Sequence, residues 1–137
     1  MKPIISLRTL ITIASMVGCW LASGSAYADL YVISNSGTTF ASGDIKDVFT
    51  GEKQFLGATK LVPVDNGPAQ EYFLFTVLGL APAKYNTIWT KKSFREGVIP
   101  PTVKAGDTEV MDFVSKTPGA IGYVRSEPRG VTVIRKY

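Results

Sequence analysis

Apolar residues recur along this chain in runs that switch between the period of a helix and the period of a strand. Within residues 108–116, the apolar positions keep the spacing of one helix face: Val110, Met111, Phe113 and Val114. Pro118 and Gly119 end this predicted helix, and the run Ala120–Val124 then predicts a short buried strand. Because Gly119 and Gly122 carry no side chain, we expect a close backbone approach at this joint; a ligand contact is the alternative.

Further segments follow the same two patterns. Three apolar runs have the length of strands: Leu30–Ser34, Leu61–Val64 and Val131–Arg135. Three stretches have helical patterns: a short helix capped by Ser42 and ended by Gly51, the most apolar helix between Pro68 and Gly79, and Ala83–Lys92. Pro63 lacks an amide donor and moves its strand toward an edge or a bulge. Residues 97–106 contain two successive prolines and predict an extended loop.

Strands that alternate with helices predict an α/β domain with a mostly parallel sheet flanked by helices. The pattern also allows one antiparallel strand at an edge. We expect the large aromatic side chains to form the core rather than a ligand cage, since such residues are mostly buried for packing. They are Tyr72, Phe73, Phe75, Tyr85, Trp89, Phe94, Phe113 and Tyr123.

The first 28 residues have the composition of a signal peptide. Lys2 and Arg8 precede the apolar run Leu10–Leu21, which is short for a membrane span, and small residues follow up to Ala28. Cleavage after Ala28 would release residues 29–137 as a single domain, periplasmic or secreted, with no transmembrane segment. A lipoprotein box ending at Cys19 is the alternative, although its first residue, methionine, is a poor one for such a box.

Composition narrows the chemistry of this domain. Cys19 is the only cysteine and lies in the predicted signal peptide, and the chain has no histidine. Disulfides, cysteine or histidine metal sites and Ser-His-Asp triads are therefore absent from residues 29–137, and we expect neither an enzyme nor a cofactor. The formal charge of +4 falls to +2 without Lys2 and Arg8, and the charges are interspersed. Nucleic-acid binding, which needs clustered basic residues, is not expected.

Several segments together resemble one family. Asp44–Lys53, which contains Val-Phe-Thr-Gly-Glu-Lys, is similar to the "IFxGK" helix of phosphate-binding proteins from ABC transporters. Leu61–Val64 and the apolar helix after it resemble the next strand and helix of that family. Pro118–Val124 matches the family's "PGxIGYV" end. The resemblance extends over about residues 30–124.

This resemblance implies a fold and a function. Family members are two-lobed periplasmic binding proteins that close around an anion, whereas this chain is about as long as one lobe. We therefore expect a single lobe of a type II periplasmic-binding-protein-like fold. The implied ligand is phosphate or a similar small oxyanion, and the implied partner is an ABC transporter permease or another protein of the cell envelope.

The loop after the first predicted strand is the candidate ligand site: Ser34, Asn35, Ser36, Gly37, Thr38 and Thr39. Backbone N–H groups and hydroxyls hold an oxyanion without a charged partner, and ligands of α/β sheets lie beyond the ends of strands. A simple polar turn is the alternative interpretation.

A second place, Gly67–Gln70, opens the apolar helix. The family has an arginine and a Ser-Gly-Thr run there, and this chain has neither. Pro68 removes a donor, and Asp65 and Glu71 repel an anion. The family's main phosphate contacts therefore do not transfer. The alternative function is an envelope interaction module that has lost its anion site.

Overall fold

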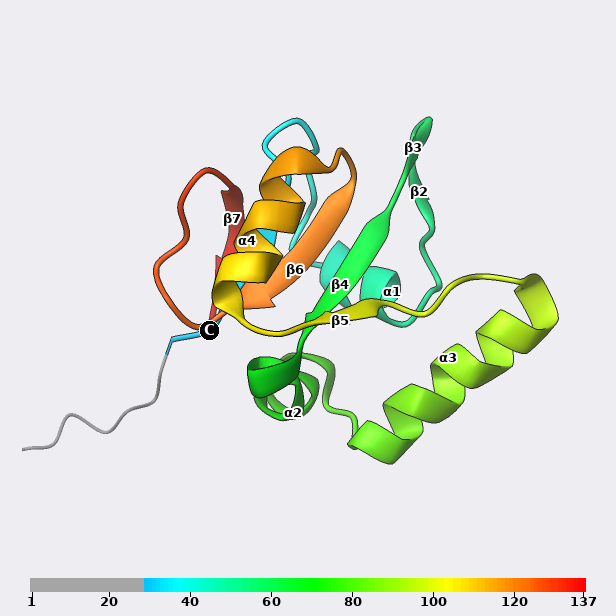
Figure 1. Cartoon of the computed structure of the whole chain (residues 1–137). Helices are drawn as coiled ribbons and strands as arrows, with labels where there is room; N and C mark the ends of the chain where they lie inside the picture. The colour runs from blue at the N-terminus through cyan, green and yellow to red at the C-terminus, as the bar shows by residue number, and fades with distance from the viewer. Residues whose placement is uncertain (1–28) are drawn as a thin grey trace, which may run out of the picture.

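The computed structural model describes residues 29–137. The predicted signal peptide, its cleavage site at Ala28 and Cys19 lie outside or at the border of these residues. The strands are β1 (Tyr31–Ser34), β2 (Phe55–Leu56), β3 (Thr59–Lys60), β4 (Val62–Asn66), β5 (Thr102–Lys104), β6 (Ala120–Val124) and β7 (Thr132–Lys136) (Figure 1). The helices are α1 (Asp44–Phe49), α2 (Gln70–Phe73), α3 (Pro82–Glu96) and α4 (Asp107–Lys116). A 3₁₀ turn (Gly67–Ala69) precedes α2, and a π-helical turn (Leu74–Leu78) follows it.

The central sheet has the strand order β5-β4-β6-β1-β7. The strands β5, β4 and β6 pair in parallel, whereas β1 pairs antiparallel with both β6 and β7. Four of the five strands thus run in one direction, and the predicted mostly parallel sheet flanked by helices is confirmed. The edge position expected for an antiparallel strand is wrong, because β7 adds outside β1 and makes β1 an interior strand.

The strand β4 contains Pro63 but lies between β5 and β6 rather than at an edge. Val62 pairs with Ala120, and its N–H donates to the carbonyl of Gly119 at 2.9 Å. Successive amides of a strand point to opposite sides, so position 63 faces away from β6. On that side β5 pairs only from Val64 onward. Proline at position 63 therefore lacks an N–H only on the side where no strand pairs with β4 at that position. An interior strand can contain proline for this reason.

The apolar pattern does not reveal two elements. The strand β5 lies inside the predicted loop 97–106, and no apolar run marks it because Thr102 and Val103 are exposed. The strands β2 and β3 form a hairpin with two residues in each strand, too short for alternation to show.

Two helix boundaries also differ from expectation. The helix α3 extends beyond the predicted Ala83–Lys92 at both ends, from Pro82 to Glu96. Ser42 does not cap α1: the residue before the helix is Gly43, which makes no side-chain cap. Instead, the Asp44 carboxylate accepts the N–H of Ala41 at 3.0 Å.

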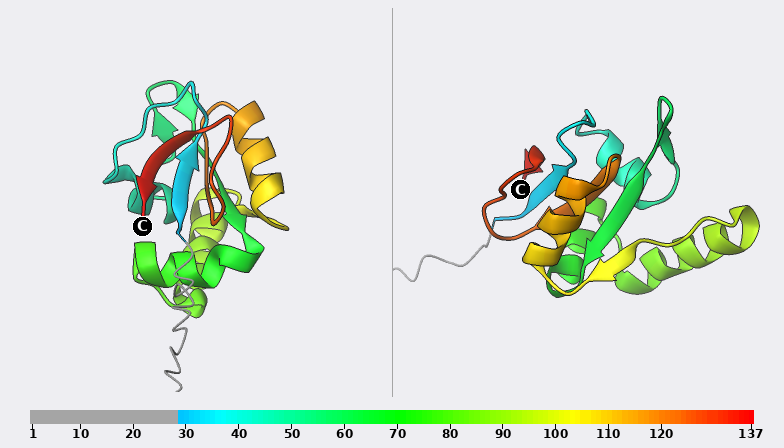
Figure 2. Two further views of the ribbon diagram at one scale, coloured as in Figure 1. Left: turned by 90° about the vertical axis from the view of Figure 1, so that its left-hand side faces the viewer. Right: turned by 45° about the horizontal axis from the view of Figure 1, so that its top comes forward.

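Two cores lie on the two faces of the sheet, and every residue of β6 is buried between them. One core packs α4 against the sheet through Ile33, Val64, Val110, Val114, Ala120 and Val124. The larger core lies under α1, α2 and α3 and receives Ile121 and Tyr123 from β6. Figure 2 shows α4 on one side of the sheet and α1 on the other. The domain therefore has three layers, helix–sheet–helix.

An aromatic cluster fills the larger core. The rings of Phe73 and Tyr123 stack with centroids 3.8 Å apart, and Phe49 meets both rings edge-on. The expectation of a buried position is wrong for Phe75 and Phe94, whose exposed fractions are 80% and 93%. Both side chains project from outward helix faces, and Phe94 lies beyond the last buried residue of α3.

None of the helices within residues 29–137 combines the length and the apolar character needed to cross a membrane.

Alanine at Gly122 is expected to reduce the free energy of unfolding by about 1–3 kcal/mol. Its Cβ would lie 2.7 Å from Val110 Cγ1 and 3.1 Å from Val64 Cγ2, so α4 would have to move off the sheet. Urea unfolding of the purified domain measures the loss. Gly43→Ala is the matched control, since a Cβ there meets no atom within 4 Å. Equal unfolding midpoints for the two variants would contradict the close packing.

Candidate functional site

The candidate loop Ser34–Thr39 lies at the opposite end of the sheet from the one expected. Because β1 runs against β4 and β6, its end meets the start of β6: Ser34 pairs with Ile121, and the N–H of Asn35 donates to Ala120 O at 3.0 Å. Ligands of α/β sheets lie at the carboxyl ends of the parallel strands. The loop is therefore not at that carboxyl edge.

Much of the loop's hydrogen-bonding capacity is used inside the protein. The Asn35 side-chain amide donates to the carbonyls of Val114 at 3.0 Å and Ser115 at 3.3 Å, at the end of α4. The buried Thr38 hydroxyl accepts the N–H of Gly119 at 3.1 Å. Ser34 Oγ donates to the Thr38 carbonyl at 3.4 Å. Asn35 and Thr38 thus tie the loop to the α4–β6 joint, and Ser34 closes the loop on itself.

The other three residues of the loop, Ser36, Gly37 and Thr39, are exposed. The N–H of Gly37 donates to Asn35 Oδ1 at 2.9 Å, which holds the turn in shape. An external ligand would therefore meet Ser36, Gly37 and Thr39, whereas Ser34, Asn35 and Thr38 would support the loop from inside.

A second polar group lies at the carboxyl edge of the parallel strands and was not identified from the sequence. Asn66 ends β4, and Arg125 and Ser126 follow directly after β6. Four donor groups from these residues converge on the side chain of Asp107, the first residue of α4: Asn66 Nδ2, the N–H groups of Arg125 and Ser126, and Ser126 Oγ. We call these four donors the carboxyl-edge cradle.

The carboxyl-edge cradle holds Asp107 as an anion. Partial burial raises the pKa of this carboxyl, but the hydrogen bonds from Ser126, Arg125 and Asn66 outweigh it and leave the pKa below its ordinary value. The Asn66 side chain is fully buried, and its Oδ1 has no hydrogen-bond partner among residues 29–137. No sequence motif links Asn66, Asp107 and Ser126, and only the fold places them next to one another.

Asp65 lies beside this edge but points into the larger core. The sequence predicts that its charge repels an anion at the start of the apolar helix, but Asp65 belongs to β4 and is buried. The hydroxyls of Tyr85 and Tyr123 donate to its two carboxylate oxygens, each at 2.9 Å. Burial raises the pKa of Asp65 to about 6, although the hydrogen bonds from Tyr85, Tyr123 and Gln70 oppose this rise. Burial and the neighbouring Asp65 charge in turn raise the pKa of both tyrosines.

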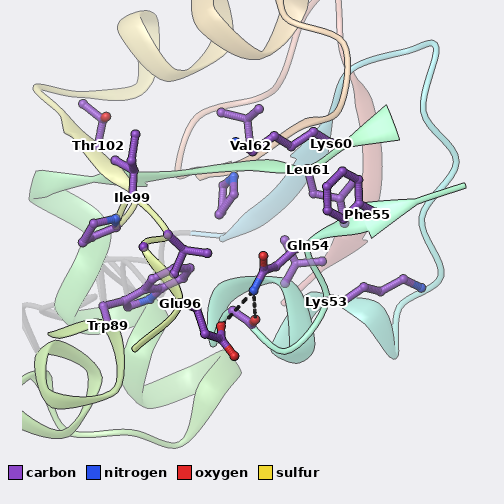
Figure 3. Close-up of a pocket in the computed structure, with 16 residues that line it drawn as sticks. Lys53, Gln54, Phe55, Lys60, Leu61, Val62, Trp89, Glu96, Ile99 and Thr102 are labelled. Atoms are coloured by element: carbon purple, nitrogen blue, oxygen red, sulfur yellow. Dashed lines mark hydrogen bonds between the residues drawn. The ribbon is translucent and has the colours of Figure 1, made fainter. Parts of the chain in front are cut away.

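A cavity of about 540 Å³ lies between the β2–β3 hairpin, the end of α3 and the segment before β5 (Figure 3). Its walls are mostly apolar and include Leu61, Val62, Trp89, Val98 and Ile99. The side-chain amide of Gln54 lines the cavity and donates to Glu96 Oε2 at 3.1 Å. Lys53 is paired with Asp44 at 2.9 Å and points away from the hollow in Figure 3. Of the polar lining residues, Gln54 and Lys53 are thus engaged with other side chains of the protein.

The sequence matches no protein-family model, and no curated protein matches it. Within residues 29–137, no three carboxylate, cysteine or histidine side chains gather as a metal site would require.

Two solved structures are similar to this chain. One, from Clostridium perfringens, is assigned to phosphate ABC transporter substrate-binding proteins and contains bound phosphate; its TM-score is 0.60 at 15% identity, over 79% of this chain and 45% of that chain. The other is an ABC-type phosphate transport receptor from Vibrio cholerae. Its TM-score is 0.48 at 13% identity, over 79% of this chain and 46% of that chain. The chain thus spans less than half the length of each. At such identities the likeness concerns the fold, which is that of a periplasmic binding protein.

Asp65 is expected to make stability fall as the pH rises from about 4 to about 7. Its pKa in the folded protein, about 6, lies above the ordinary value of 3.8. Its contribution is therefore complete below pH 4 and is lost as the pH passes through 6, on the order of 3 kcal/mol. Urea unfolding at several pH values measures this loss as the difference between the parent and Asp65→Asn. Asp112→Asn, at an exposed carboxylate, is the control. A difference that stays constant with pH would contradict the assignment.

Proposed function

We propose that this protein is a periplasmic, single-lobe, solute-binding-like protein that binds a small oxyanion such as phosphate. The observation that carries the proposal is the fold shared over 79% of the chain with a structure that contains bound phosphate. That neighbour is named as a substrate-binding protein, which supports binding rather than catalysis as the role of this chain.

The proposed ligand site is the loop Ser34–Thr39. Its exposed residues Ser36 and Thr39 offer hydroxyl and backbone donors to an anion, while the N–H of Gly37 is used by Asn35 Oδ1 to hold the turn. The buried residues Asn35 and Thr38 fix the loop from inside. A site on one lobe stays open to water, where each neutral hydrogen bond contributes only about 0.5–1.5 kcal/mol. Affinity for free phosphate is therefore expected to be weak. A transporter permease or another envelope protein would supply the second wall.

Replacing Ser36 and Thr39 together with alanine is expected to weaken phosphate binding about tenfold, since two hydrogen bonds of about 0.7 kcal/mol each are lost. The thermal midpoint should stay the same because both residues are exposed. Isothermal titration of residues 29–137 with phosphate and with sulfate measures the change.

Thr38→Ala is the matched control for this loop. It removes the buried acceptor of the Gly119 N–H, so it should lower the thermal midpoint. If the Ser36/Thr39 variant binds phosphate as the parent does, the loop is only a polar turn. If the parent gives no heat with millimolar phosphate or sulfate, the oxyanion-binding function itself is wrong.

The export route gives a separate prediction. Because small residues lead up to Ala28, the exported protein is expected to begin at Asp29. The intact mass of the protein from the periplasmic fraction measures this start. A mature form that begins at a lipid-modified Cys19 would contradict it and would place the domain on a membrane.

A further inference from the structure

The carboxyl-edge cradle directs more hydrogen-bond donors at one carboxylate than the start of a helix requires. Asp107 Oδ2 accepts from the N–H of Ser126 at 2.8 Å, from Ser126 Oγ at 2.7 Å and from the N–H of Arg125 at 3.2 Å. Asp107 Oδ1 accepts from Asn66 Nδ2 at 2.7 Å and shares the N–H of Arg125 at 3.2 Å. We infer that the carboxyl-edge cradle is an oxyanion-binding site and that the carboxylate of Asp107 occupies it as an internal ligand.

The chemistry of the donors supports this inference. Two successive backbone N–H groups that point at one anion form a concave anion-binding element, and a hydroxyl and a side-chain amide complete it. All four donors belong to residues outside α4. They are therefore separate from the free N–H groups with which a helix start binds an anion, and Asp107 reaches them from a different element.

The place of the cradle in the fold also supports it. Asn66 and Lys104 are paired across β4 and β5, and Arg125 follows β6, so three neighbouring parallel strands end together. This carboxyl edge is where α/β sheets bind ligands. The cationic groups of Lys104 and Arg125 lie over the rings of Phe113 and Tyr72, 4.5 and 4.6 Å from the ring centroids. The neutral donors at this edge thus converge on one anion, which the chain supplies itself as Asp107.

The buried amide of Asn66 fixes one donor of the cradle in place, since its Nδ2 also donates to the carbonyl of Tyr123 at 3.1 Å. Its Oδ1 is without a hydrogen-bond partner among residues 29–137, while its Nδ2 donates to Asp107. Because both atoms belong to one amide, an unsatisfied polar atom lies directly beside the cradle. The unpartnered oxygen is an acceptor and does not bind an oxyanion, so the donor Nδ2 is the part of the amide that belongs to the cradle.

A tethered carboxylate has a high effective concentration, so Asp107 outcompetes free anions for the cradle in the parent protein. The ligand class of the cradle is a small carboxylate or a related oxyanion, which binds once Asp107 is displaced or replaced by another residue. The site is distinct from the loop Ser34–Thr39, and the inference does not depend on phosphate binding there.

Asp107→Ala tests the inference, because formate restores the carboxylate that this change removes. We expect the variant to have a lower thermal midpoint than the parent in potassium chloride. We expect formate at the same ionic strength to recover much of the loss, half-maximally at roughly millimolar to tens of millimolar concentration. Potassium chloride controls for screening of charges.

Two variants serve as controls. Asp112→Ala removes the same charge from α4 at an exposed ion pair with Lys116, so formate should not change its midpoint relative to chloride. Asp107→Ala combined with Ser126→Ala removes a cradle donor, and its recovery should need at least several-fold more formate.

The site is supported if formate raises the thermal midpoint of Asp107→Ala more than it raises the midpoints of the parent and of Asp112→Ala. Equal effects of formate and chloride on a folded Asp107→Ala overturn it, and Asp107 is then only a contact between α4 and the turn after β6. If Asp107→Ala is unfolded in chloride, the same titration is followed by circular dichroism. Return of the native spectrum with formate then supports the site. If the native spectrum does not return at about 200 mM formate, roughly tenfold above the expected midpoint, the inference is overturned.

Discussion

The packing of β6 between two layers is the constraint on which the rest of the domain depends. Its five residues are all buried, and alternate positions enter the α4 core and the larger core. Gly122 leaves space for Val110 of α4. Gly119, with φ at +79°, allows the carbonyl of Lys60 to approach, where a side chain would collide with it. The helix α4, the β3–β4 connection and the start of β6 are thereby fixed relative to one another.

The same constraint explains which elements the sequence predicted well. The strand Ala120–Val124 has its predicted limits, and the helix before it differs by one residue, because burial on both sides leaves a strong apolar pattern. The strand β5 has no such pattern, since its residues lie at an exposed edge. The interior position of β1 depends on where β7 adds to the sheet, and no local property of either segment reports it.

The candidate sites show a different limit of sequence reasoning. Residue types identified hydroxyls and an amide in the loop Ser34–Thr39, but they did not show that Asn35 and Thr38 bond to groups about 80 residues away. A polar side chain serves a ligand only when the fold has not already satisfied it. The converse holds for Asn66 and Ser126, which are unremarkable in sequence and meet only because β4 and β6 end side by side. Predicting either outcome requires the pairing of the strands first.

The attachment of α3 has a spectroscopic consequence. This helix projects from the body of the domain (Figure 1), and its buried residues are Tyr85 and Trp89. Trp89 is the only tryptophan in residues 29–137, and its indole N–H donates to the carbonyl of Phe49 at 2.9 Å. The emission wavelength of residues 29–137 therefore reports whether one helix is docked, whereas circular dichroism averages over every helix and strand. A red shift that precedes the loss of secondary structure on heating would mean that α3 detaches as its own cooperative unit.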